Sequence, residues 1–206
     1  MHITFGRRPR LTALGAGLLT AAAFALSASG PALADTTDTG GSGTLSVPVA
    51  VVAGLAKANI AALPGTPASS SFDPTTGSDS FTMPVTGGTG EVSNFSGKVE
   101  FGGSMVFING ANGKSVTITG IELNFFNGAL TGILPGGTKH TVLAYVRGDS
   151  STSTSAGPPA TETFTTDELD LSSKAAGALN TGLGTKAFIK GTDIGGFTTT
   201  YDVTIT

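Results

Sequence analysis

The alternation of hydrophobic and polar residues predicts a chain built mainly from short antiparallel strands. Between residues 99 and 125, apolar side chains recur at every second position, as they do in strands with one buried face. Glycine pairs and Asn-Gly turns interrupt the pattern at 102–103, 109–113 and 127–128, where the chain bends or reverses. Further segments with strand character are 80–85, 130–134, 142–146, 164–171 and 197–205. This succession predicts an antiparallel β-sandwich or open barrel.

Two short helices are expected among the strands. Apolar residues recur at helical spacing through Val49–Asn59, Pro48 suits the first helical turn, and Pro64 forbids continuation. A strand through Leu45–Val52 is the competing interpretation of the same region. The second helix is expected over Lys174–Leu183, after a capping serine and before helix-ending glycines.

The N-terminal segment has the organisation of a secretory signal peptide over residues 1–34. Three arginines precede the uncharged apolar run Leu11–Ala28, and an A-x-A sequence ends at Ala34, which predicts cleavage between Ala34 and Asp35. A membrane anchor is the alternative, but glycine, serine and threonine dilute the apolar run. Two adjacent arginines also leave twin-arginine export open. The expected mature protein is extracellular or cell-wall associated and has no transmembrane segment.

The remaining chain is expected to form a single domain. Residues 35–43 are all Asp, Thr, Gly or Ser and predict a flexible lead, so the packed β-rich domain is expected over 44–206. Residues 149–160 are rich in Ser, Thr, Gly and Pro and predict a mobile surface loop. Without the signal peptide roughly 170 residues remain, which is enough chain to bury one core.

Composition and charge exclude several kinds of site and partner. The 206 residues include no Cys, which excludes disulfides, thiolate metal sites and cysteine nucleophiles. The formal charge is −3, from 11 Lys and Arg against 14 Asp and Glu. Loss of the three signal arginines leaves 8 against 14, a charge of −6. A domain this acidic is not expected to attract nucleic acids or anionic membranes.

Three side chains are weak candidates for binding or chemistry: His140, Tyr145 and Tyr201. His140 is the sole histidine after the signal peptide and would be the base of a secreted esterase-type hydrolase, but the G-x-S-x-G sequence of such enzymes is absent. A solvent-facing histidine at a strand end is the simpler interpretation. Tyr145 lies opposite the apolar face of its strand, whereas Tyr201 lies on an apolar stripe, which predicts a core position. No catalytic residue is assigned.

The acidic residues do not form a recognisable metal site. Asp167, Glu168 and Asp170 are the densest cluster, but they lack the ligand spacing of a calcium loop and predict a solvated strand edge. The other glutamates of this kind are expected to be isolated and to face outward, because they alternate with apolar residues. They are Glu91, Glu100 and Glu122.

Three stretches, in their order and spacing, resemble a known family. They are Ser71–Gly77, Phe95–Gly103 and Ala178–Phe188. Together they are similar to the HtaA-type domains of secreted actinobacterial proteins, over most of the chain that follows the signal peptide. The resemblance implies a β-rich extracellular domain, and some members of the family bind haem at the cell surface.

Two departures from the family concern the haem ligands. HtaA-type haem binders carry a Trp- and Tyr-bearing segment at the start of the domain, whereas Leu45–Ile60 contains no aromatic residue. They also carry a histidine soon after the F-x-G of the central strand, whereas Phe101–Gly103 is followed by Ser104 and Met105. The ligands are therefore not carried over, and no cofactor is expected.

The predicted function is a secreted, non-catalytic module of the extracellular space or cell envelope with a binding or structural role. Its expected partner is a small molecule or a cell-wall component. A haem-binding surface protein and a secreted esterase-type hydrolase are the alternatives.

Overall fold

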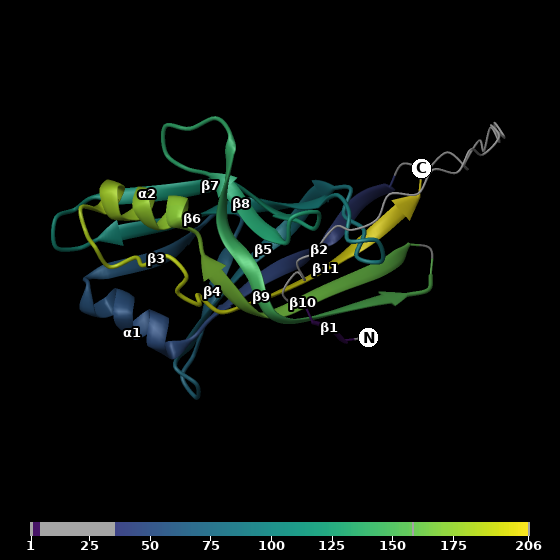
Figure 1. Ribbon diagram of the computed structural model, residues 1–206, viewed down its shortest axis with the longest axis horizontal. Coiled ribbons are helices and arrows are strands. Elements are labelled where there is room, and N and C mark those ends of the chain that lie inside the picture. Colours follow the sequence, from purple (N-terminus) through teal and green to yellow (C-terminus); the bar gives the residue numbers. More distant parts are fainter. Residues whose placement is uncertain (1, 5–35, 158, 206) are drawn as a thin grey trace, which may run out of the picture.

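Figure 1 shows the computed structural model, which describes residues 2–4, 36–157 and 159–205. The described residues form eleven strands and two helices. The strands are β1 (His2–Thr4), β2 (Thr36–Val47), β3 (Ile60–Gly65), β4 (Ser69–Asp73), β5 (Ser78–Gly88), β6 (Lys98–Asn109), β7 (Ser115–Asn124), β8 (Ala129–Ile133), β9 (His140–Ser155), β10 (Ala160–Leu171) and β11 (Gly196–Ile205). The helices are α1 (Val49–Lys57) and α2 (Ser173–Leu183).

Eight of the strands form a closed antiparallel barrel. Their order is β5-β6-β7-β8-β9-β10-β11-β2, and β2 pairs with β5 to complete the circle. Outside it, β3 pairs with β6, β4 with β5 and β1 with β9. The predicted antiparallel, mainly β fold with two helices is confirmed. Alternation alone could not show the closure, because the closing β5–β6 ladder is short and joins only Val85–Gly88 to Val99–Phe101.

Local sequence signals explain several element boundaries. The Ser172 side chain accepts a hydrogen bond from the Ala175 N–H at 3.0 Å and so caps α2, as expected of a serine at this position. Gly184 ends α2 with a φ of 64°, which a residue without a Cβ adopts at little cost. The β6–β7 register shifts at Gly102–Gly103, where the glycine pair predicted a bulge.

Two segments that were expected to be loops are strands. Thr36–Gly43, within the expected flexible lead, belong to β2 and pair with β11. The expected mobile loop at 149–160 is also wrong over most of its length, because β9 continues to Ser155 and pairs with β10. Both segments lack an apolar stripe, but they are rich in threonine or serine and lie beside strands that carry one.

Aromatic side chains pack the barrel interior. Phe101 and Phe197 meet edge to face with ring centroids 5.5 Å apart, and Phe125 and Phe164 have the same arrangement. β2 approaches the first pair at Gly43. A Cβ at Gly43 would lie 2.5 Å from Phe101 Cε1 and 2.7 Å from Phe197 Cζ, so only glycine fits between the strand and these rings.

The substitution Gly43→Ala is expected to destabilise the fold by about 1–3 kcal/mol, because the added methyl group overpacks the Phe101–Phe197 pair. Gly54→Ala on α1 is the matched control. Apart from the helix's own neighbouring backbone, no atom lies within 4 Å of its added Cβ, and alanine is expected to stabilise the helix by about 0.5–1 kcal/mol. Urea unfolding measures both changes. A Gly43→Ala protein that unfolds at the parent's midpoint would contradict the close approach.

Most of the predicted signal peptide lies outside the described residues, and so does the predicted cleavage site between Ala34 and Asp35. Within residues 1–34, the described segment is β1, which pairs with Asp149–Ser151 of β9. Cleavage therefore stays a prediction. Neither of the two described helices has the length and apolar character that crossing a bilayer requires.

Candidate functional site

The two ends of the barrel differ: one is covered by a loop and the other is open (Figure 1). At one end, residues 89–97 between β5 and β6 fold over the interior, and we call them the cap loop. The Gly90 N–H donates to Asp38 Oδ2 at 2.6 Å, and the Val92 N–H donates to Glu162 Oε2 at 2.9 Å. At the other end, α1 and α2 flank the barrel and leave it open between them.

This open end contains a cavity of about 960 Å³. Its volume lies at the upper end of the range of about 300–1,000 Å³ that is typical of ligand pockets. The walls are mostly apolar and come from the barrel, from α1 and from the segment after α2. Prominent among them are Leu45, Phe81, Met105, Phe107, Leu55 and Phe188. The charged lining residues are Lys57, Asp79 and Asp193.

Helix α1 forms one wall of the cavity, and its composition is unusual for a surface helix. Val49–Ala56 are all apolar or glycine, yet none of the residues of α1 is buried. A surface helix normally has one polar face and one face packed on the core. α1 packs on the core only in part, through Val51, Val52 and Leu55. A partly packed apolar helix over an apolar cavity is suited to completing its packing against a bound molecule. The missing polar face is the sequence signal that could have indicated this site.

The cavity does not fit a haem held by histidine or tyrosine. Proteins ligate haem iron through His, Tyr, Cys or Met. Among the described residues that line the cavity, the one residue of these types is Met105. The three predicted candidates, His140, Tyr145 and Tyr201, do not line it.

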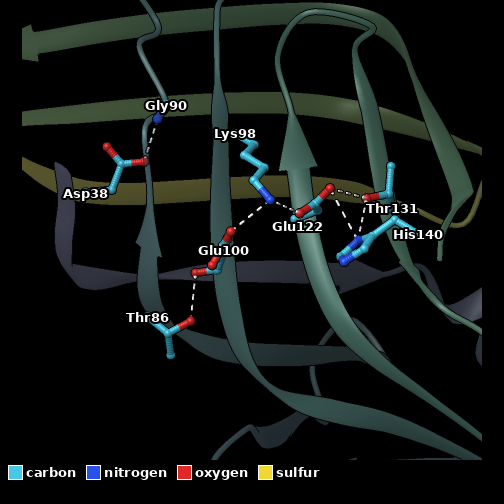
Figure 2. A network of polar contacts seen from close by, with 8 residues as sticks. All are labelled: Asp38, Thr86, Gly90, Lys98, Glu100, Glu122, Thr131 and His140. Atoms are coloured by element: carbon cyan, nitrogen blue, oxygen red, sulfur yellow. Dashed lines mark hydrogen bonds and ion pairs between the residues drawn. The ribbon is translucent and has the colours of Figure 1, made fainter. Parts of the chain in front are cut away.

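His140 belongs to a row of polar side chains that crosses four strands (Figure 2). Lys98 Nζ on β6 lies 2.8 Å from Glu100 Oε1 and 2.9 Å from Glu122 Oε2 on β7. Thr131 on β8 donates to Glu122 Oε1 at 3.1 Å, and His140 Nδ1 lies 3.3 Å from the same oxygen. The prediction that Glu122 is isolated is therefore wrong, since its side chain contacts Lys98, Thr131 and His140 and is only 8% exposed.

Lys98 offsets the repulsion between two acids that face each other. Glu100 and Glu122 are direct neighbours in the β6–β7 register, and like charges in such pairs destabilise a sheet. The Lys98 ammonium lies between them, and its bonds to Glu100 first and Glu122 second raise the pKa of Lys98. Burial of Glu122 depends on its cross-strand neighbours, so alternation within one strand could not predict it.

The contacts of His140 with described residues do not have the arrangement of a Ser-His-Asp hydrolase. In a Ser-His-Asp arrangement the acid holds one ring nitrogen and the nucleophile meets the other. Here Glu122 and the Thr131 hydroxyl, at 3.3 and 3.4 Å, both lie at Nδ1. Within the described part of the chain, Nε2 makes no hydrogen bond. His140 is exposed and begins β9, as expected, but it also contacts Glu122 and Thr131 of the polar row.

Tyr145 and Tyr201 lie in opposite surroundings. Tyr145 is 39% exposed on β9, and the Arg147 guanidinium lies 5.6 Å from its ring centroid. Tyr201 is fully buried and donates to Glu162 Oε2 at 3.0 Å, which agrees with its predicted core position. Burial first, and then the Glu162 charge, raise the pKa of Tyr201. Since the two tyrosines and His140 share no hydrogen-bond partner, they do not form one site.

A pair of buried carboxylates holds the cap loop. Asp38 is 1% exposed and Glu162 is 5% exposed. Asp38 Oδ1 has no hydrogen-bond partner among the described residues. Burial raises the pKa of Asp38 to about 7, the Gly90 N–H lowers it, and the nearby charge of Glu162 raises it. Asp38 was missed from the sequence because it lies in the segment that was expected to be a flexible lead.

Comparisons with known proteins give a structural match. No protein-family model matches the sequence, and no curated protein matches it. The crystal structure of the C-terminal domain of HtaA from Corynebacterium glutamicum aligns with a TM-score of 0.57 at 16% sequence identity, over 82% of this chain and 99% of that one. The chain is therefore similar in fold, at a distance, to an HtaA-type domain.

Proposed function

We propose that this chain is a secreted binding module that takes an apolar small molecule into the cavity between α1 and the open end of the barrel. The cavity itself carries the proposal, because about 960 Å³ of apolar-walled space is enough to enclose a ligand. The N-terminal signal-peptide pattern supports export, and the distant similarity to an HtaA-type domain is compatible with a binding role.

The ligand class that suits these walls is a long acyl chain with an acidic end group. Aliphatic and aromatic side chains line most of the surface, so the main gain on binding is removal of apolar surface from water. Lys57 is the cationic residue on the lining and lies in the last turn of α1, where it can meet a carboxylate. Haem is the less suitable ligand, because the lining offers no histidine or tyrosine to hold the iron.

Filling the cavity is expected to weaken binding of a fluorescent fatty acid, cis-parinaric acid. Ala62 lines the cavity on β3 and pairs with Phe107, so Ala62→Phe places a ring in the space of the ligand. Displacement of two methylene groups of the ligand corresponds to roughly tenfold weaker binding. Leu63→Phe is the matched control, because Leu63 is the next residue on β3, is 46% exposed and does not line the cavity.

Haemin, added to the same proteins, separates the two ligand classes. We expect saturable binding of the fatty acid by the parent and by Leu63→Phe, and no Soret shift with haemin. Equal binding of the fatty acid by the parent and by Ala62→Phe would contradict the cavity as its site. A Soret shift that Ala62→Phe abolishes would replace the acyl chain with haem as the ligand.

A further inference from the structure

The segment after α2 presents an exposed apolar side chain at the mouth of the cavity. We call residues 184–194 the mouth loop. Ile189 lines the cavity mouth and is 66% exposed. Lys186 and Lys190, three residues before and one residue after it, are also exposed. A large aliphatic side chain therefore stands in solvent between two cations.

The fold fixes this exposure, because the mouth loop is held on both sides of Ile189. The Asn180 side chain accepts from the Phe188 N–H at 3.0 Å and donates to the Phe188 carbonyl at 2.7 Å. The Phe188 ring then packs edge to face on Phe107, with centroids 5.8 Å apart. On the other side, the Gly191 N–H donates to the Leu171 carbonyl at 2.8 Å. These contacts hold the backbone on both sides of Ile189 in place.

Half of the basic residues of the described domain lie around the mouth of the cavity. Residues 36–205 carry 8 Lys and Arg against 13 Asp and Glu, a net charge of −5. Four of the eight basic residues surround the mouth, where they are exposed and form no ion pair with described residues. These are Lys57, Lys114, Lys186 and Lys190. The lining itself carries Lys57 against Asp79 and Asp193, and Asp170 pairs with Asp193.

Two buried acids lie at the opposite end of the barrel. Asp38 and Glu162 lie in the barrel beneath the cap loop, and the charges of Glu91 and Glu100 act on the same buried groups. β2 runs from this end, at Asp38, to the mouth, at Val47 (Figure 1). The whole-chain charge, which predicted no attraction to anionic membranes, does not show the local group of exposed lysines around Ile189.

We infer that the mouth of the cavity docks on the surface of an anionic lipid bilayer. The unpaired lysines would lie at the negatively charged headgroups, and each would add to binding that weakens with salt. Ile189 would enter the apolar boundary below the headgroups, which a soluble polyanion does not offer. Docking in this orientation opens the cavity toward the acyl chains. The link to ligand uptake from the bilayer rests on the proposed function, whereas docking itself does not.

Co-sedimentation with vesicles tests the inference. The full chain is expected to bind vesicles of phosphatidylglycerol in phosphatidylcholine, to release them as salt rises, and to bind pure phosphatidylcholine vesicles much less. Lys186→Gln with Lys190→Gln is expected to weaken binding roughly thirtyfold, from two lysines near the surface. Ile189→Ser is expected to weaken it roughly tenfold by loss of apolar burial. The apolar N-terminal segment is the same in all variants, so differences in vesicle binding between them come from the mouth loop.

Matched controls remove a lysine and a large apolar side chain outside the mouth loop. Lys139→Gln, on the turn between β8 and β9, and Phe126→Ser, on the turn between β7 and β8 and 88% exposed, are expected to leave binding unchanged. The inference would be overturned if the protein showed no preference for phosphatidylglycerol vesicles. It would also be overturned if the control variants, and not the mouth-loop variants, lost vesicle binding. If the lysine substitutions weaken vesicle binding but Ile189→Ser does not, the mouth would bind soluble polyanions, and the inference would also be overturned. Ala62→Phe is expected to bind vesicles normally, so a failure of docking and a failure of the proposed cavity function remain distinguishable.

Discussion

The substitution Glu162→Ala is expected to destabilise the barrel by about 4 kcal/mol, because two buried hydrogen-bond donors lose their acceptor. The Val92 N–H and the Tyr201 hydroxyl both donate to Glu162 Oε2, at 2.9 and 3.0 Å. Val92 is 1% exposed and Tyr201 is fully buried, so water cannot replace the carboxylate without opening the cap loop. Each buried donor left without a partner costs about 1–3 kcal/mol.

Urea unfolding measures this loss, and two further variants separate its causes. Glu162→Gln keeps an acceptor at nearly the same place and is expected to cost much less than Glu162→Ala. Tyr201→Phe removes one donor and is expected to cost about 1.5–3 kcal/mol, the usual contribution of a hydrogen bond to a charged group. If Glu162→Ala unfolds at the same urea concentration as the parent, the carboxylate does not hold the cap loop.

The free energy of unfolding is expected to fall by about 4 kcal/mol as the pH rises from about 4 to above 7, through ionisation of Asp38. The pKa of this carboxyl is raised from 3.8 to about 7 in the folded chain, chiefly by burial. The folded state therefore holds the proton more tightly than the unfolded state does. This contribution to stability is fully present below pH 3.8 and is lost as the pH rises through about 7.

The substitution Asp38→Asn isolates this effect, because asparagine stays neutral and can still accept from the Gly90 N–H. The difference in unfolding free energy between the two proteins is expected to grow in favour of Asp38→Asn between pH 4 and 8. Amide hydrogen exchange at Gly90 provides a local measure, since ionised Asp38 and Glu162 repel each other beneath the cap loop. A pH-independent difference would show that Asp38 titrates at its ordinary value.

The sequence predicted elements whose own residues carry the signal. β6 and α2 were found because an apolar stripe of period two or of helical spacing runs through each, with Ser172 and Gly184 marking the ends of α2. The first half of β2 and the second half of β9 were missed for the opposite reason. Their inward positions hold Asp38, Gly43 and Ser150, which a reading of single segments assigns to loops. Their strand structure comes from pairing with β10 and β11.

The candidate site could not be predicted from the sequence, for a related reason. Its walls come from five strands, both helices and the mouth loop, and no spacing along the chain brings Leu45, Phe107 and Phe188 together. The burial of Glu122 likewise depends on Thr131 and His140, which lie on neighbouring strands. What the sequence did contain was an apolar helix without a polar face, and that observation now has a structural explanation.

The pairing of β2 with β11 has a consequence for how this domain can be combined with others. Thr36 lies opposite Ile205, so the chain enters and leaves the barrel at neighbouring points. A domain of this kind can be inserted into a surface loop of another protein without pulling its ends apart, and it tolerates circular permutation. The same pairing makes closure a late event during synthesis. Until β11 emerges, β10 and β2 each present an unpaired edge that a second, equally incomplete chain could occupy.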